Sequence, residues 1–193
     1  MRLSSLVFAA VAVLTSSIPY ALASSTARNP ISQLGAIKNA TIHTASHRVT
    51  AVSSFDLSFE LFEGQVRLSL EPNHDIIPDG AKVEYLGADG EVMREEPIDR
   101  LAHKVYKGTA WTWSERRHEW QQVGWARINV RRDGSQPLFE GHFTINHDHH
   151  HIQRSSHYMQ TKHELDPAAE DRGDDYMVAF RECLLYTSPS PRD

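Results

Sequence analysis

Apolar and polar residues alternate with a period of two along much of the chain, and this pattern predicts β-strands. Between residues 55 and 61 every second position is apolar, namely Phe55, Leu57, Phe59 and Leu61. Such spacing places the apolar side chains on one face of a strand, whereas a helix would need a period near 3.6. Residues 66–70 repeat the alternation after Glu63-Gly64, and Pro72 ends it because proline has no N–H for an interior ladder. The two runs predict a β-hairpin.

Two more hairpins are predicted where short alternating runs flank an Asp-Gly step, a sequence typical of tight β-turns. The first has residues 83–86 and 91–93 around Asp89-Gly90, and the second has residues 126–130 and 139–145 around Asp133-Gly134. After the first 23 residues, no segment carries a long apolar stripe with helical spacing. We therefore expect an all-β fold, an antiparallel sandwich or open barrel of six to eight strands made of short hairpins.

Aromatic residues gather between residues 105 and 113, in a further predicted strand. Trp111 and Trp113 are two positions apart and so fall on one face of it. We interpret them as a core or cross-strand aromatic pair, and a platform for a carbohydrate or peptide is the alternative.

The N-terminus has the pattern of a secretory signal peptide. Arg2 gives a short positive start, residues 6–14 form an apolar run, and Ala21-Leu22-Ala23 offers small residues to a signal peptidase, so we expect cleavage after Ala23. The run is shorter than the roughly 20 residues that span a bilayer, and no second long run follows, so no transmembrane segment is expected in this fragment. Asn39-Ala40-Thr41 is an acceptor sequence for N-glycosylation at Asn39, which fits a chain in the secretory pathway.

These signals divide the chain into five parts. We expect a signal peptide in residues 1–23, an N-terminal segment in 24–52, a β core in 53–166, an acidic linker or the start of another strand in 167–182, and a spurious tail in 183–193. The tail, CLLYTSPSPRD, is typical of read-through into foreign sequence, and on that interpretation the gene product continues past Arg181. A genuine disordered tail is the alternative.

Charge and motifs exclude several classes of function. The formal net charge is −5, so the basic footprint of a nucleic-acid-binding protein is missing. The single cysteine, Cys183, allows no internal disulfide. His118-Glu119 and His163-Glu164 begin like the zinc-protease signature His-Glu-x-x-His, but the second histidine is missing from both. Since no Gly-x-Ser-x-Gly elbow or phosphate-binding loop is present either, we assign no catalytic residue and no cofactor to this fragment.

Histidines gather in one segment, because seven of the twelve lie in residues 142–163. If the preceding strand continued through this segment, His147, His149 and His151 would project from one face, where imidazoles could chelate zinc, copper or nickel. A solvated histidine loop without a ligand is the alternative. A further hypothesis needs no metal: histidines that face a partner would gain charge in an acidic compartment and loosen the complex.

Several short motifs follow one another in a recognisable order. They are the alternating Phe/Leu strand, its Leu-x-Leu-x-Pro-Asn ending at residues 68–73, Gly-Trp-Ala at 124–126, Leu-Phe-Glu-Gly at 138–141, and the histidine run before Tyr158-Met159-Gln160. With this order, residues 29–166 resemble the N-terminal propeptide, or prodomain, of ADAM-type zinc metalloproteases (the disintegrin and metalloproteinase family), most closely those of filamentous fungi. The chain would then be truncated before the catalytic domain.

The resemblance implies a function and a partner. A propeptide of this family assists the folding of the downstream metalloprotease domain of the same chain and keeps it latent until it is cut away. Zinc would belong to that domain, so the full-length parent would be a zinc metalloendopeptidase, secreted or anchored to a membrane through its missing C-terminal part. Cys183 lacks a matching context and is not given the role of capping the zinc.

The residues alone leave two rival functions open. The first is a free-standing secreted β domain that binds a metal or ligand through its His-rich segment. The second is an autonomous hydrolase, for which the sequence offers no catalytic set.

Overall fold

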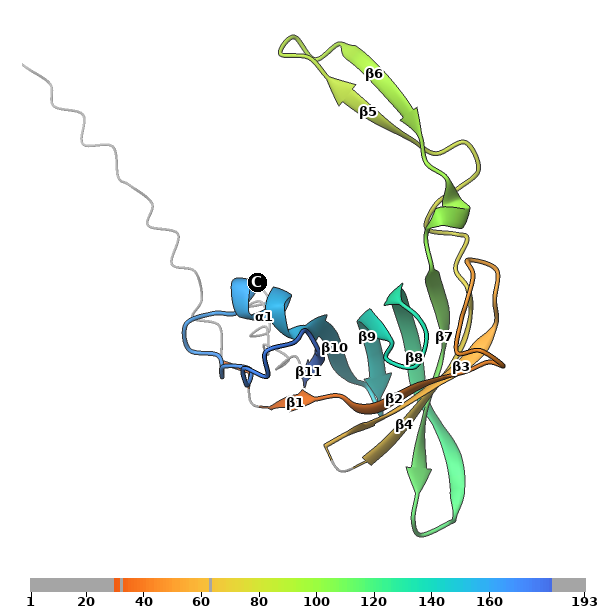
Figure 1. Cartoon of the computed structure of the whole chain (residues 1–193), viewed down its shortest axis with the longest axis vertical. Coiled ribbons are helices and arrows are strands. Elements are labelled where there is room, and N and C mark those ends of the chain that lie inside the picture. Colours follow the sequence, from red (N-terminus) through yellow and green to blue (C-terminus); the bar gives the residue numbers. More distant parts are fainter. Residues whose placement is uncertain (1–29, 32, 63, 182–193) are drawn as a thin grey trace, which may run out of the picture.

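The computed structural model describes residues 30–31, 33–62 and 64–181, and strands dominate this part of the chain (Figure 1). The expected cleavage site at Ala23 and the tail with Cys183 lie outside the described residues. The strands are β1 (Leu34–Ala36), β2 (Lys38–His43), β3 (Phe55–Leu61), β4 (Gly64–Pro72), β5 (Lys82–Leu86), β6 (Val92–Pro97), β7 (Val105–Ser114), β8 (Glu119–Arg132), β9 (Leu138–Ile145), β10 (Asp148–Arg154) and β11 (Met177–Arg181). A short 3-10 helix, η1 (Arg100–Ala102), precedes β7, and the α-helix α1 (Ser155–Thr161) lies between β10 and β11.

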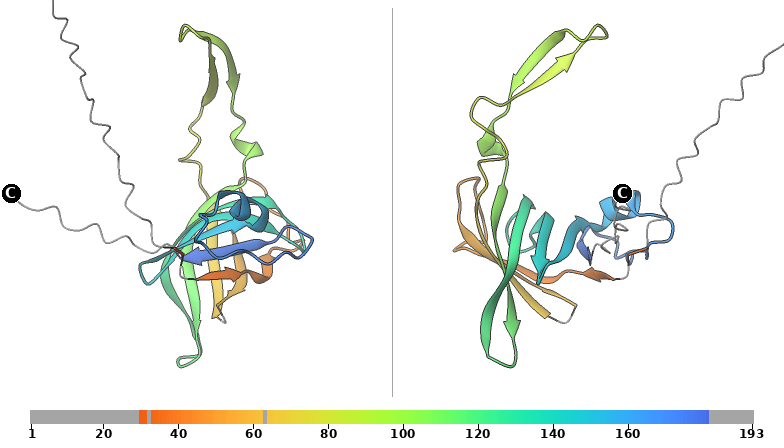
Figure 2. Two further views of the ribbon diagram at one scale, coloured as in Figure 1. Left: turned by 90° about the vertical axis from the view of Figure 1, so that its left-hand side faces the viewer. Right: turned by 180° about the vertical axis from the view of Figure 1, so that it is seen from behind.

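Nine of these strands form one sheet that curls into a nearly closed barrel (Figures 1 and 2). The order is β1-β11-β10-β9-β8-β7-β4-β3-β2, and each strand is antiparallel to its neighbours. Most neighbours in the sheet are also consecutive in the sequence, as expected for strands that short turns connect. The two edge strands, β1 and β2, are separated along the chain by a single residue.

That residue, Ile37, closes the barrel because it joins two short strands at opposite edges of the sheet. β1 pairs with β11, whereas β2 pairs with β3. The N–H of Ile37 donates to the carbonyl of Met177 at 2.9 Å, and its side chain is buried in the core. Because one continuous segment pairs first with β11 and then with β3, the unpaired edges of the sheet are limited to the short strands β1 and β2.

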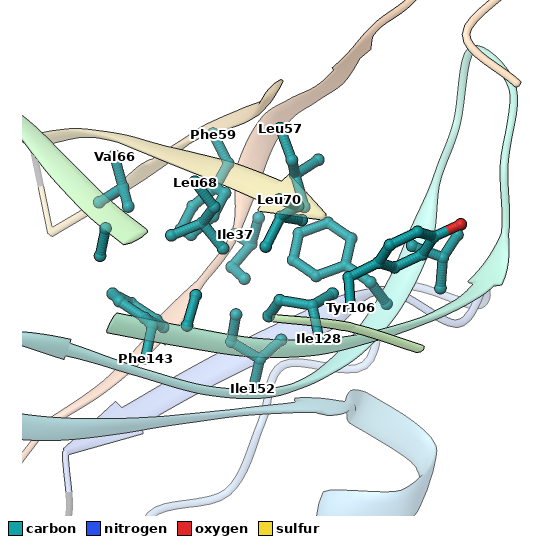
Figure 3. Close-up of a cluster of buried hydrophobic side chains, with 14 of the residues drawn as sticks. Ile37, Leu57, Phe59, Val66, Leu68, Leu70, Tyr106, Ile128, Phe143 and Ile152 are labelled. Atoms are coloured by element: carbon teal, nitrogen blue, oxygen red, sulfur yellow. The ribbon is translucent and has the colours of Figure 1, made fainter. Parts of the chain in front are cut away.

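The alternating pattern fills the barrel interior with apolar side chains. Buried and half-buried residues alternate along all of β3, and the same pattern continues from Val66 to Leu70 in β4. Figure 3 shows side chains of β3, β4, β7, β8, β9 and β10 pointing toward one another in this core. The ring centroid of Phe59 lies 5.7 Å from that of Phe139 and 5.8 Å from that of Phe143, so aromatic contacts connect β3 with β9 across the barrel.

β11 is buried on both faces because a second layer covers it from outside. Met177 and Ala179 point into the barrel core, whereas Val178 and Phe180 belong to a smaller cluster with Tyr158 of α1. This explains the uninterrupted apolar run of β11, since a strand with two buried faces shows no alternation. The Tyr158 hydroxyl donates to the carbonyl of Pro167 at 2.8 Å and so fixes the following loop against α1.

The connection between β4 and β7 leaves the barrel as a long arm (residues 73–104). It ends in the β5–β6 hairpin, a separate two-stranded sheet in which no residue is buried. The N–H of Asn73 donates to the carbonyl of Val105 at 2.9 Å, so the arm leaves and re-enters the barrel at one place. Figures 1 and 2 show that the arm projects from the barrel and bends toward the side on which α1 lies.

The predicted all-β antiparallel fold is confirmed, as are the hairpins around Asp89-Gly90 and Asp133-Gly134. The expected number of six to eight strands is too low, because short strands with weak alternation add to the sheet. β1 and β2 come from residues 24–52 and β11 from residues 167–182, so both segments contribute to the barrel. The sequence did not predict α1, since seven residues give little helical periodicity.

Candidate functional site

The His-rich segment forms a tight hairpin instead of one continuous strand. Asn146 and His147 make the turn between β9 and β10, and their φ angles are 48° and 76°. Positive φ at both central residues is the geometry of a type I′ turn, for which asparagine is well suited. β10 then runs back along β9, which places His151 opposite His142. The strand therefore does not continue through His147, and the condition for placing His147, His149 and His151 on one strand face is not met.

The hairpin places the three candidate metal ligands in different surroundings. His147 lies exposed in the turn. His149 and His151 lie on the outer face of β10, where the His149 ring contacts Trp125 of β8 with 5.9 Å between centroids. Throughout residues 30–181, apart from the two omitted positions, no three His, Cys, Asp or Glu side chains are grouped so that they could hold one metal ion.

His151 is part of an aromatic stack on the outer face of the sheet. Its ring lies parallel to that of Phe180 with 5.1 Å between centroids, and it lies 4.2 Å from the ring of His142. Phe180 in turn contacts Tyr158 of α1. The imidazole of His151 therefore helps to pack the second layer against the barrel.

His150 points into the barrel, and this side chain differs most from a solvated histidine. Only 6% of the residue is exposed, and its ring stacks on Phe143 at 5.0 Å. Burial lowers the pKa of His150 below its usual value of 6.5. The positive charge of Arg181 and the neighbouring His149 act in the same direction, whereas Asp148 opposes them through its carboxylate and its carbonyl, 3.0 Å from Nδ1. The fold therefore favours the neutral imidazole.

The unfolding free energy is expected to fall as the pH is lowered through 6.5, and His150 should contribute to this fall. Its pKa is lower in the folded state, so the unfolded chain binds the proton more readily in the range just below 6.5. The contribution of His150 to the unfolding free energy is complete above pH 6.5 and is lost as the pH falls through the lower pKa of the folded state. Measured by urea unfolding, the unfolding free energy of His150→Gln should fall less between pH 7.5 and pH 5.5 than that of the wild type. Equal losses in the two proteins would contradict this expectation.

An arginine lies between two tryptophans on the outer face of β4, β7 and β8. The guanidinium of Arg67 lies 4.7 Å from the ring centroid of Trp120 and 5.6 Å from that of Trp111. The ring centroids of Trp113 and Trp120 lie 5.6 Å apart across the β7–β8 hairpin, a partner for Trp113 that the sequence analysis did not name. Cation–π contacts of this type contribute about 0.5–2 kcal/mol. The cluster stiffens the end of the hairpin.

A surface pocket of about 420 Å³ lies beside this cluster, with Trp120 as an aromatic wall. Two hydrogen-bonded pairs line it. His43 Nε2 lies 2.7 Å from Ser58 Oγ, and Asn39 Nδ2 donates to Glu60 Oε1 at 3.0 Å. Convergent polar groups beside an aromatic ring can bind a small polar ligand such as a sugar. Sequence reasoning missed this pocket because its residues come from separate strands and occupy positions that appeared only to be solvated.

Three similar proteins carry the same name, disintegrin and metalloproteinase domain-containing protein B. The Aspergillus fumigatus protein is 47% identical over 156 residues, or 79% of this chain. The Arthroderma otae protein is 41% identical over 184 residues and the Arthroderma benhamiae protein 40% identical over 183 residues, each covering 94% of this chain. By sequence, this chain belongs to the ADAM-type family.

The ADAM-type chain spans only part of these relatives, between 20% and 23% of their length. No model of a protein family matches the chain, and no solved structure matches it. In the described part of this ADAM-type chain, no helix has the length and apolar character required to cross a membrane.

The incomplete zinc-protease motifs of the ADAM-type chain do not lie on helices. His118 occupies the turn of the β7–β8 hairpin with a φ of 53°, and Glu119 begins β8. His163 follows α1 in a turn that Asp166 stabilises, because its carboxylate accepts from the N–H of His163 at 3.1 Å. The paired histidines of the signature need one face of a helix, so neither segment has the required backbone.

Proposed function

We propose that this chain is the propeptide of a secretory-pathway zinc metalloendopeptidase of the ADAM type. One observation carries the proposal: proteins named as metalloproteinases are 40–47% identical to it, yet the chain accounts for only 20–23% of their length. The remaining 77–80% of each relative is long enough for the metalloproteinase and disintegrin domains that its name gives. Zinc belongs to that remaining part, and the partner of the barrel is the metalloprotease domain of the same polypeptide.

A tethered barrel would hold the enzyme latent by a simple physical effect. A binding module on the same polypeptide acts at a millimolar effective concentration when its linker is short and flexible, so even a modest affinity keeps the site occupied. Cutting the linker removes that advantage, and the barrel then dissociates on dilution. The same contact would assist folding, because a module that binds only the folded domain stabilises it.

Latency and folding assistance can be tested together in a chimera. Residues 1–181 of this chain replace the matching segment of the Aspergillus fumigatus relative, and peptidase activity of the secreted protein is measured before and after limited proteolysis of the linker. We expect activity to rise at least about tenfold on cleavage, the change expected if the bound state of the tethered chain is favoured over its open state by about 1.4 kcal/mol. A chimera without residues 24–181 should be secreted in much lower amount. Full activity before cleavage, with normal secretion of the shortened chimera, would refute the proposal.

The secretory route makes Asn39 an N-glycosylation site. Asn39 is exposed, and its φ of 51° is a left-handed conformation that asparagine tolerates well. It lies where the pairing of β2 with β3 shifts, so its backbone is outside the regular ladder. A glycan on Nδ2 would leave one N–H for the bond to Glu60. The protein secreted from a eukaryotic host should lose the mass of one glycan on treatment with an endoglycosidase, and Asn39→Gln and Thr41→Ala should each abolish that shift. An unchanged shift in both variants would exclude this site.

A further inference from the structure

The β5–β6 hairpin exposes apolar side chains that the barrel does not cover. The described residues include twelve large apolar side chains that are exposed, and seven of them belong to the arm: Ile76, Val83, Tyr85, Leu86, Val92, Met93 and Leu101. None of the hairpin residues belongs to either hydrophobic cluster of the barrel. Exposed apolar groups that are concentrated on one projecting element mark a binding surface, whereas scattered ones do not.

The three most exposed apolar residues of the hairpin lie at its tip, and most of its charged residues lie along its length. Leu86 and Val92 are directly opposite each other beside the turn, with 63% and 46% of their surfaces exposed. Met93, at the adjoining irregularity of the ladder, is 78% exposed. Nearer the barrel, Lys82 pairs with Glu95 at 2.6 Å. Val83 and Tyr85, which lie along the ladder, are less exposed, at 42% and 45%, so the largest apolar exposure is at the tip.

The hairpin also carries a net negative charge. Residues 82–97 contain five acidic and two basic side chains, a net charge of −3. Both basic residues are engaged within the hairpin, Lys82 with Glu84 and Glu95 and Arg94 with Glu96. Asp89 and Glu91 stand in the turn next to the apolar tip. A complementary partner would offer an apolar depression bordered by positive charge.

A hairpin of two strands alone is at best marginally stable in water. The described arm adds no further strand to support it, and its base is held by few contacts, such as the ion pair of Arg100 with Asp79 at 2.8 Å. A partner that covered the tip would stabilise the hairpin in the conformation seen here. The arm bends toward the side of the barrel that carries α1 and β11, the last described strand (Figures 1 and 2).

We propose that the β5–β6 hairpin is the docking element for the metalloproteinase part of the same polypeptide, which its apolar tip, Leu86, Val92 and Met93, contacts directly. This inference rests on the proposed function, which names the partner. The relatives support this choice of partner, because 77–80% of their length lies outside the segment that matches this chain. A partner on the same polypeptide is always present at high local concentration.

Inhibition of the processed Aspergillus fumigatus enzyme by added chain tests the proposal. Leu86→Ser removes an apolar side chain at the tip from a residue that is 63% exposed. Leu165→Ser is a matched control, because Leu165 is 64% exposed and lies after α1, outside the arm. A third variant replaces residues 82–97 by Asn-Gly. This short turn fits because the N–H of Ile98 already donates to the carbonyl of Ala81 at 2.9 Å.

We expect the inhibition constant to rise about tenfold for Leu86→Ser and at least a hundredfold for the hairpin replacement, with no more than a twofold change for Leu165→Ser. Folding of each variant is checked by tryptophan fluorescence, because all four tryptophans lie in β7 and β8 and report on the barrel alone. In the chimera, a photoreactive residue in place of Met93 should cross-link to the metalloproteinase part, and one in place of Leu165 should not.

The outcomes separate this inference from the proposed function. If the hairpin replacement inhibits as well as the wild type, the docking inference is wrong and the propeptide function stands. If the folded wild type does not inhibit at all, the proposed function fails and the docking inference fails with it. If light scattering shows a dimer that Leu86→Ser dissociates while inhibition is unchanged, the tip binds a second copy and the inference is overturned.

Discussion

Gly141→Ala should destabilise the barrel by at least about 3 kcal/mol, lowering its melting temperature by roughly 6–12 °C. Gly141 lies in the middle of β9, between β8 and β10. Its φ of 150° is one that residues with a side chain rarely adopt, and a Cβ there would lie 2.0 Å from the carbonyl oxygen of Arg127. Because that oxygen belongs to the backbone of β8, relief requires β8 and β9 to separate. Melting followed by tryptophan fluorescence measures the effect.

Gly134→Ala is the control that separates the cost of atomic overlap at an added Cβ from the cost of a positive φ. Gly134 also has a positive φ, of 98°, but a Cβ there would meet no atom within 4 Å. It lies in the turn between β8 and β9, and its N–H donates to the carbonyl of His47 at 2.7 Å, a bond that alanine retains. We expect a loss of about 1–2 kcal/mol from conformation alone. Equal losses at the two glycines would show that the close approach at Gly141 contributes nothing.

Phe139→Ala should cost about 3–5 kcal/mol of unfolding free energy. Phe139 has no exposed surface, and its ring contacts Phe59 across the barrel. Removing the ring leaves a cavity among residues of strands that are already paired on both sides, so the walls can move only little to fill it. Urea unfolding of the variant at pH 7.5, followed by tryptophan fluorescence, gives the difference directly.

Tyr85→Ala on the arm is the matched aromatic control. Tyr85 is 45% exposed, and its hydroxyl donates to Glu96 within the same hairpin. The hairpin contributes nothing to the barrel core. The unfolding free energy measured in urea through the tryptophans of β7 and β8 should therefore change by no more than about 0.5 kcal/mol. A large loss in this variant would mean that the arm supports the barrel, contrary to the structure.

Much of the fold could be predicted because the barrel strands bury only one face. Period-two alternation in residues 55–61 and 66–70 marks β3 and β4 almost to the residue. Alternation does not mark β11, which is apolar on both faces, although another strand in residues 167–182 was among the expectations. It does not mark β10 either, where the buried His150 is polar. Closure of the barrel through Ile37 could not be predicted from the sequence. It depends on the pairing of β1 with β11 and of β2 with β3, and local sequence does not determine these partners.

The candidate sites were predicted less well, because they depend on contacts between distant segments. The sequence located the histidine run, but the turn at Asn146-His147 reverses the strand and separates the proposed ligands. The pocket beside Trp120 joins residues of four separate strands, and no local motif marks it. The arm was predicted as a hairpin from Asp89-Gly90, but its separation from the barrel is visible only in three dimensions.

The central claim is that this barrel binds and inhibits a metalloproteinase of its own family. The most direct measurement is a titration of the processed Aspergillus fumigatus enzyme with the folded chain, with peptidase activity and bound heat recorded together. We expect saturable inhibition at one chain per enzyme, and we expect it to be lost when the chain is unfolded before it is added. Undiminished activity and no heat of binding, from a chain whose tryptophan melting shows a folded barrel, would contradict it.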